Sequence, residues 1–124
     1  MNDYDFGKNQ EIMIWNLLKK KYTDLEMTSG RFNDWDYIDK ENVMELKSRR
    51  ITSYEYADTI IGSNKIYKGK NMLRAGLNVK FIFNFTDGVY YFDLEENDTF
   101  KESFFNGKLH SFINIRDKLK ILNI

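Results

Sequence analysis

Two apolar segments joined by a short turn constrain the fold more than any other feature of the chain. They are Val79–Phe85 and Val89–Leu94, and Asp87-Gly88 lies between them. Asp-Gly between two apolar runs is a favoured tight turn of a β-hairpin. The first segment, VKFIFNF, is apolar enough to be a central strand. The chain therefore predicts a protein built on a β-sheet.

The remaining segments predict helices and strands around this hairpin. Residues Lys8–Tyr22 have a helical repeat that places Trp15 and Leu18 on one face, with Glu11 on or near it. Three strands are predicted next, at Leu25–Ser29, Phe32–Ile38 and Val43–Ile51. A helix is predicted between Ala57 and Ala75, and it starts or breaks near Gly62-Ser63-Asn64. Near the C-terminus, we expect a short strand at Ser111–Ile115 and a short helix at Arg116–Leu122. The order predicts an α/β fold in one domain, residues 1–124.

Composition excludes several classes of chemistry. The formal net charge of +0 excludes a histone-like polycation, and the absence of cysteine excludes a disulfide scaffold and a cysteine-based zinc site. The single histidine, His110, cannot form a two-histidine metal site, and we interpret it as a surface or packing residue. Any chemistry must come from carboxylates, Lys and Arg, hydroxyl groups, and a metal held by oxygen.

The chain has no apolar run of membrane-spanning length, and its polar first residues differ from a signal peptide. We expect a soluble intracellular protein without a membrane partner. The lack of proline and the abundance of Lys, Asn, Ile, Phe and Tyr suggest an AT-rich genome, such as that of a virus or an AT-rich bacterium.

The most informative window runs from Arg31 to Ile51. If Asp39–Asn42 is a four-residue hairpin loop, Ile38 faces Val43 and Asp36 lies directly across from Glu45. Opposed residues on paired strands have Cβ atoms about 4.5–5.5 Å apart. Two carboxylates at that distance repel unless a cation or a shared proton lies between them. With oxygen ligands alone, the cation expected here is Mg²⁺ or Mn²⁺.

The same register places Asp34 across from Lys47. Because side chains alternate along a strand, one face is expected to carry Asp34, Asp36, Glu45, Lys47 and Arg49. The alternative is a solvated strand face with ordinary ion pairs. Apolar residues flank these charges on both strands, which favours the first interpretation.

The pattern resembles the PD-(D/E)XK nuclease superfamily. The resemblance depends on Asp36 and on Glu45-Leu46-Lys47 as the E-x-K element on the next strand, and it covers about Lys8 to Leu94. Glu11 matches a carboxylate that many members carry in the first helix. No proline precedes the aspartate, and Asp34 is an alternative to Asp36.

The resemblance implies a restriction-endonuclease-like αβββαβ core with a mixed central sheet flanked by helices. It also implies a deoxyribonuclease that hydrolyses phosphodiester bonds with Mg²⁺ or Mn²⁺. Asp36, Glu45 and the Leu46 backbone carbonyl would hold the metal, with Glu11 as a further ligand. Lys47 would orient or help deprotonate the attacking water.

Charge along the chain indicates a phosphate-rich partner such as a nucleic acid, and the resemblance implies DNA more than RNA. Residues 47–80 contain eight basic and two acidic residues, and clustered basic residues attract phosphates. The expected nucleic-acid-binding residues are Arg49, Arg50, Lys65 and Lys68. A domain this small is expected to need a second copy or a partner subunit to grip a duplex. The alternative function is a catalytically silent nucleic-acid-binding or protein-interaction module on the same fold.

Overall fold

The structure is a computed structural model, and it describes residues 2–28 and 34–124. The elements in chain order are α1 (Asp3–Leu18), β1 (Glu26–Met27), β2 (Tyr37–Ile38), β3 (Asn42–Ser48), β4 (Asp58–Gly62), α2 (Ser63–Arg74), β5 (Asn78–Phe85), β6 (Gly88–Asp93), β7 (Lys101–Phe105), β8 (Lys108–Asn114), α3 (Ile115–Lys118) and β9 (Lys120–Ile121).

The strands of the described residues form two sheets. The main sheet has the order β1-β2-β3-β5-β6-β9, and the small sheet has the order β4-β8-β7. Strands β3 and β5 are parallel, whereas the neighbouring pairs are antiparallel, so the main sheet is mixed. The predicted α/β class with a mixed sheet and helices is therefore confirmed.

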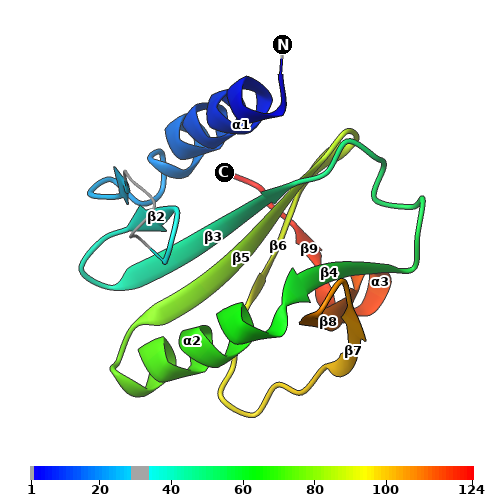
Figure 1. The fold of residues 1–124 in the computed structure, drawn as a ribbon. Coiled ribbons are helices and arrows are strands. Elements are labelled where there is room, and N and C mark those ends of the chain that lie inside the picture. Colours follow the sequence, from blue (N-terminus) through cyan, green and yellow to red (C-terminus); the bar gives the residue numbers. More distant parts are fainter. Residues whose placement is uncertain (1, 29–33) are drawn as a thin grey trace.

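The central hairpin has the predicted form. β5 lies between β3 and β6 in the main sheet, and Phe85 pairs with Gly88 at the turn. Phe81, Ile82 and Phe83 are fully buried. A strand that is apolar on both faces must be covered on both faces. Figure 1 shows α1 on one side of this sheet and α2 on the other.

Strand β3 divides its side chains between these two layers. Met44 and Leu46 pack with Ile14 and Leu18 of α1. Val43 belongs to the other core, which includes Ile66 of α2 and the phenylalanines of β5. Side chains alternate along a strand, so Glu45 and Lys47 point to the α2 side.

The first helix is shifted toward the N-terminus relative to its prediction. It begins at Asp3 because the Asn2 side chain accepts a hydrogen bond from the Asp5 backbone N–H at 2.8 Å and caps the first turn. It ends at Leu18, and the Trp15 Nε1–H donates to the Leu25 carbonyl at 3.0 Å. That contact folds the following chain back along the helix.

The helix expected somewhere between Ala57 and Ala75 occupies only the second part of that range. Residues 58–62 form β4, which pairs with β8 from Asp58↔Asn114 to Gly62↔His110. Thr59 and Ile61 are buried while their neighbours are more exposed, which is the alternation of a strand. The helix starts at Ser63, one of the predicted starting points, and Gly76, just after its end, has φ +91°.

The C-terminal predictions were partly right. The strand expected at Ser111–Ile115 is the second half of β8. The helix expected at Arg116–Leu122 is a single turn, α3, because residues 120–121 pair with β6 as β9. Near the N-terminus, β1 and β2 are shorter than predicted, and the expected turn at Ser29-Gly30 lies outside the described residues.

The connection from β3 to β4 is attached to the β5–β6 turn. Ser53 donates to the Asp87 carboxylate from its backbone N–H at 2.7 Å and from its hydroxyl at 2.5 Å. The Thr86 N–H donates to the Ile51 carbonyl at 3.0 Å. Within residues 2–28 and 34–124, no helix combines the length and apolar character needed to cross a membrane.

Candidate active site

The hairpin register that brings the carboxylates together is the predicted one. Tyr37 pairs with Met44, and Ile38 pairs with Val43. The turn is fixed by Asp39, whose Oδ1 accepts hydrogen bonds from the Glu41 N–H at 2.8 Å and the Asn42 N–H at 2.7 Å. This local bonding sets which residues of the two strands face each other.

Asp36 lies where β2 separates from β3. Its backbone N–H donates to the Met44 carbonyl at 2.9 Å, and its Oδ2 accepts a hydrogen bond from the Leu46 N–H at 2.7 Å. The N–H and C=O of one strand residue point to the same side. The Leu46 carbonyl is therefore directed toward the strand edge where the Asp36 carboxylate lies.

Glu45 is buried beside Asp36. It is only 7% exposed, and its carboxyl group shares a hydrogen bond with that of Asp36. Burial, and then the negative charge of Asp36, raise the pKa of Glu45 to about 7. A large share of the molecules therefore carries a proton on this pair of carboxyls at neutral pH.

Two lysines converge on the same oxygen of Glu45. Lys47 Nζ lies 3.6 Å from Glu45 Oε2, and Lys65 Nζ lies 3.7 Å from it. Lys65 comes from α2, and its ammonium is 5.0 Å from the centre of the Trp35 ring. Lys65, expected to bind nucleic acid, is thus part of the carboxylate cluster.

Glu11 approaches the cluster from α1. Burial and the charge of Asp36 raise its pKa, and Lys8, whose Nζ lies 3.8 Å from Glu11 Oε2, acts in the opposite direction. The Tyr37 hydroxyl donates to the Glu11 backbone carbonyl at 2.7 Å. This bond joins the helical turn that carries Glu11 to the strand that begins directly after Asp36.

Asp34 lies apart from the carboxyl pair. Its side chain is exposed, and its Oδ1 is 3.0 Å from Lys68 Nζ. The hydrogen bond from Lys68 lowers the pKa of Asp34. The pairing of Asp34 with Lys47 does not form, because the β2–β3 ladder of the described residues begins at Tyr37. Lys68 is engaged with Asp34.

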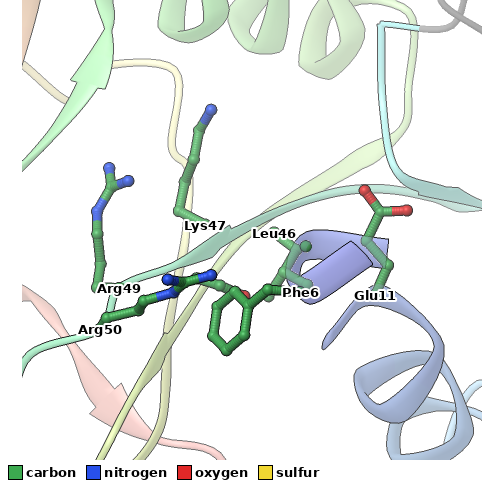
Figure 2. Close-up of a pocket in the computed structure, with 8 residues that line it drawn as sticks. Phe6, Glu11, Leu46, Lys47, Arg49 and Arg50 are labelled. Atoms are coloured by element: carbon green, nitrogen blue, oxygen red, sulfur yellow. The ribbon is translucent and has the colours of Figure 1, made fainter. Parts of the chain in front are cut away.

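A pocket of about 400 Å³ lies between α1 and the end of β3. Its walls are Phe6, Gly7, Glu11, Leu46, Lys47, Ser48, Arg49 and Arg50. Figure 2 shows Lys47 and Arg49 on one side of the strand and Arg50 lying along the Phe6 ring. The Arg50 guanidinium carbon is 3.8 Å from the centre of that ring.

Sequence reasoning missed Phe6, Gly7, Ser48 and Trp35 as members of this region. One signal could have found the first two. Asn2 followed by Asp5 is typical of a helix start, because an asparagine at this position caps the helix and an acid in the first turn suits its dipole. That start would have placed Phe6 and Gly7 on the same helix as Glu11.

The donor set fits a hard divalent cation. Mg²⁺ in proteins is commonly held by one or two carboxylates and several waters, with oxygen as the ligand atom. Asp36, Glu45 and the Leu46 carbonyl supply that chemistry, and a bound cation would offset the charge of Asp36, which together with burial raises the pKa of Glu45. Across residues 2–28 and 34–124, however, no group of three His, Cys, Asp or Glu side chains is arranged around one metal position.

Comparison of the chain with protein-family models, curated proteins and solved structures found no match.

Proposed function

We propose that this chain is a Mg²⁺- or Mn²⁺-dependent nuclease with a restriction-endonuclease-like fold that hydrolyses phosphodiester bonds in DNA. The observation that carries the proposal is the pairing of Asp36 with the buried Glu45, on which Lys47 and Lys65 converge. Four ionisable groups from three segments of the chain meet at one strand edge, which is typical of a catalytic site.

The element order supports the resemblance to the PD-(D/E)XK superfamily. A helix, an antiparallel strand pair with the acidic residues, a helical crossover and a parallel strand follow one another as α1, β2–β3, α2 and β5. Strand β4, which the resemblance does not imply, precedes the crossover helix and belongs to the small sheet.

Asp36, Glu45 and the Leu46 carbonyl are the groups that would hold the metal, and Glu11 would add a ligand or orient the others. A bound divalent cation lowers the pKa of a water molecule and stabilises negative charge on the phosphate. Lys47 then serves to orient the attacking water and to balance charge that develops on the phosphate oxygens. Lys65, from α2, places a second positive charge beside the Glu45 carboxylate.

Release of the proton from the Asp36–Glu45 pair can be used to detect metal binding without measuring cleavage. A cation bound by both carboxylates displaces this proton. Mg²⁺ or Mn²⁺ added at pH 6.5–7 to the protein in weak buffer should release protons, and Glu45→Gln should abolish the release.

Cleavage of labelled single-stranded, duplex and branched DNA, and of RNA, tests the proposal directly. Each substrate is incubated with Mg²⁺, Mn²⁺ or EDTA, and folded Lys47→Ala is compared with Lys40→Ala, which removes an exposed lysine in the β2–β3 turn. We expect metal-dependent cleavage of DNA by the wild type and Lys40→Ala, and its loss in Lys47→Ala. Binding of DNA without cleavage by the wild type would instead identify a catalytically silent module.

A further inference from the structure

The small sheet has an inner face on the core and an outer face away from it. Figure 1 shows the sheet beside the start of α2, and Ser63 of that helix is hydrogen-bonded to Ser111 of β8, with 2.8 Å between the hydroxyl oxygens. Ile61 of β4 and Ile113 of β8 are buried on the same side and belong to the core that includes residues of α2. Side chains alternate along a strand, so the residues between these lie on the outer face.

Three aromatic rings of the outer face contact one another. They are Phe105 of β7 and His110 and Phe112 of β8, and we call them the aromatic cluster. The Phe105 and His110 rings are stacked within 4° of parallel, with their centres 4.0 Å apart. The Phe112 ring meets the Phe105 ring edge-on, with 6.4 Å between centres and 62° between planes. Neither phenylalanine packs in the two hydrophobic cores formed by the described residues, so core packing does not account for this cluster.

The aromatic cluster is both held in place and accessible. The His110 Nδ1–H donates to the Lys108 carbonyl at 3.0 Å, which fixes the orientation of the imidazole ring. Its strand, β8, lies between β4 and β7. Phe105 is nevertheless 37% exposed, and Phe112 is half-buried. A ring that is already held loses little conformational entropy when a flat ligand stacks on it.

Two exposed lysines stand beside the rings on the same face. Lys101 pairs with Phe112, and Lys108 pairs with Phe105. Opposed residues on paired strands have Cβ atoms about 4.5–5.5 Å apart. Each lysine is therefore close enough to a ring to contact the phosphate of a nucleotide whose base stacks there.

A single carboxylate lies on this face among the described residues of β4, β7 and β8. The acids of these strands are Asp58 and Glu102. Asp58 is on the outer face at the first position of β4, where it pairs with Asn114. Glu102 pairs with Ser111 and lies on the inner face, where its carboxylate accepts a hydrogen bond from the Tyr67 hydroxyl. The two lysines therefore outnumber the acid of the outer face.

This combination favours a nucleic acid over a second copy of the chain as the ligand. Lysine is depleted in interfaces between proteins. Aromatic rings with basic residues beside them are a common means by which proteins hold single strands, because every base has a flat face and every phosphate a charge. In a duplex the bases stack on one another, so stacking on a protein ring requires an unpaired base.

The small sheet is attached to the strand that carries Glu45. Arg49, directly after β3, donates from Nη2 to the Ile60 carbonyl of β4 at 2.8 Å. Ile60 is on the outer face, because it pairs with Phe112. Glu45 lies four residues before Arg49, at most about 14 Å along the chain. A strand held on the rings therefore lies near the end of β3 that leads to the carboxyl pair.

We propose that the outer face of the small sheet binds single-stranded DNA. Bases stack on the rings of the aromatic cluster, and Lys101 and Lys108 hold phosphates. The proposal rests on the proposed function, which supplies the choice of DNA and the role of the surface. That role is to hold the strand that is cleaved at the Asp36–Glu45 pair.

Binding in EDTA tests this surface without cleavage. Fluorescence anisotropy measures the affinity for a labelled 12-nucleotide single-stranded DNA, for an abasic strand of the same length and for the matching RNA, at 50–200 mM salt. Phe105→Leu and Phe112→Leu, each shown to be folded, should weaken binding of the DNA about fivefold or more and leave binding of the abasic strand unchanged. Lys101→Ala should weaken binding of both and reduce the slope of log K against log salt by about 0.7.

Two matched controls come from exposed side chains outside this face. Phe104 is 72% exposed and precedes Phe105 on the same strand, so it lies on the opposite face. Phe104→Leu should bind all three strands like the wild type. Lys40→Ala, in the β2–β3 turn, should keep both the affinity and the salt slope.

Unchanged binding of the DNA by both Phe105→Leu and Phe112→Leu would overturn the proposal. An equal loss in Phe104→Leu, tighter binding of the RNA, or no binding by the folded wild type would also overturn it. So would self-association of the wild type that Phe105→Leu abolishes in sedimentation velocity, because the face would then be a contact between copies.

Cleavage of the same DNA with Mg²⁺ is measured separately, which distinguishes failure of this surface from failure of the proposed function. Cleavage by the wild type with unchanged binding in the ring variants would refute the surface and leave the nuclease. Weakened binding in the ring variants with no cleavage by the wild type would support the surface and contradict the nuclease.

Discussion

Two charged side chains are buried to the same extent in neighbouring strands of the main sheet. Glu45 on β3 and Lys80 on β5 are each 7% exposed. Lys80 Nζ lies 2.7 Å from Asp93 Oδ1 and 4.0 Å from the centre of the Tyr91 ring. Asp93 is 63% exposed on its side chain, so the Lys80 charge is neutralised by one partner that remains in water.

Glu45 has no such simple partner. A second carboxyl lies beside it, and two lysines approach the same oxygen at 3.6 and 3.7 Å. The Lys80–Asp93 pair is electrostatically complete, whereas burial and Asp36 raise the pKa of Glu45 to about 7. Burial of a charge alone does not indicate a functional site; buried like charges held together do.

The largest expected difference between the two regions is in catalysis. Glu45→Gln should reduce DNA cleavage by about 10³-fold, because it removes a charge required where the transition state forms. Lys80→Met, at the complete pair, should cleave at the rate of the wild type. Single-turnover cleavage with Mg²⁺ measures both, and equal rates in Glu45→Gln and wild type would refute the assignment of Glu45.

The next effect is on stability as a function of pH in EDTA. Burial and Asp36 raise the pKa of Glu45 from 4.5 to about 7 in the folded protein. The folded state therefore keeps a proton that the unfolded chain releases. The resulting stabilisation is fully present below about pH 4.5 and is lost as the pH rises through about 7. The shift corresponds to about 3 kcal/mol.

Urea unfolding at pH 5 and pH 8 measures this effect. The free energy of unfolding of the wild type should fall more between these values than that of Glu45→Gln, in which the group does not titrate. The Lys80→Met protein should retain the fall of the wild type. Identical pH dependence in Glu45→Gln and the wild type would contradict the raised pKa.

A smaller effect on the free energy of unfolding is expected when either member of the Lys80–Asp93 pair is removed. Asp93→Ala leaves a buried ammonium without its carboxylate and should cost about 2 kcal/mol. Lys80→Met leaves an exposed carboxylate that water solvates, and should change the stability by less than about 1 kcal/mol. Denaturant unfolding of both variants at pH 7 tests this asymmetry, and equal losses would contradict it.

The smallest expected effect distinguishes the two aspartates of the β2 segment. Asp34 is exposed and hydrogen-bonded to Lys68, so Asp34→Asn should change cleavage by no more than about twofold. Asp36→Asn should resemble Glu45→Gln. Loss of cleavage in Asp34→Asn with activity retained in Asp36→Asn would reverse the assignment.

The parts of the fold that the sequence predicts correctly are those set by local bonding. The Asp39–Asn42 turn and the Asp87-Gly88 hairpin fix their registers through groups within a few residues. The opposition of Asp36 and Glu45 follows from the first of these turns.

The errors lie where pairing is distant in sequence. Strand β4 was not predicted, because its partner, β8, lies 48 to 56 residues further along the chain. The contact of Arg49 with Ile60 was missed because it depends on β4, which was not predicted as a strand. The pattern of apolar and polar residues within 47–80 does not predict the pairing of β4 with β8 or the hydrogen bond from Arg49 to Ile60.

The attachment of Ser53 and Ile51 to the β5–β6 turn has a consequence for the order of folding. The connection that directly follows the pocket residues Arg49 and Arg50 is held by contacts 34 and 35 residues apart in the chain. Such distant contacts form late because closing long loops costs entropy. A ribosome-bound chain that has emerged only as far as α2 can pair β2 with β3. It completes the pocket only after β5 and β6 have emerged.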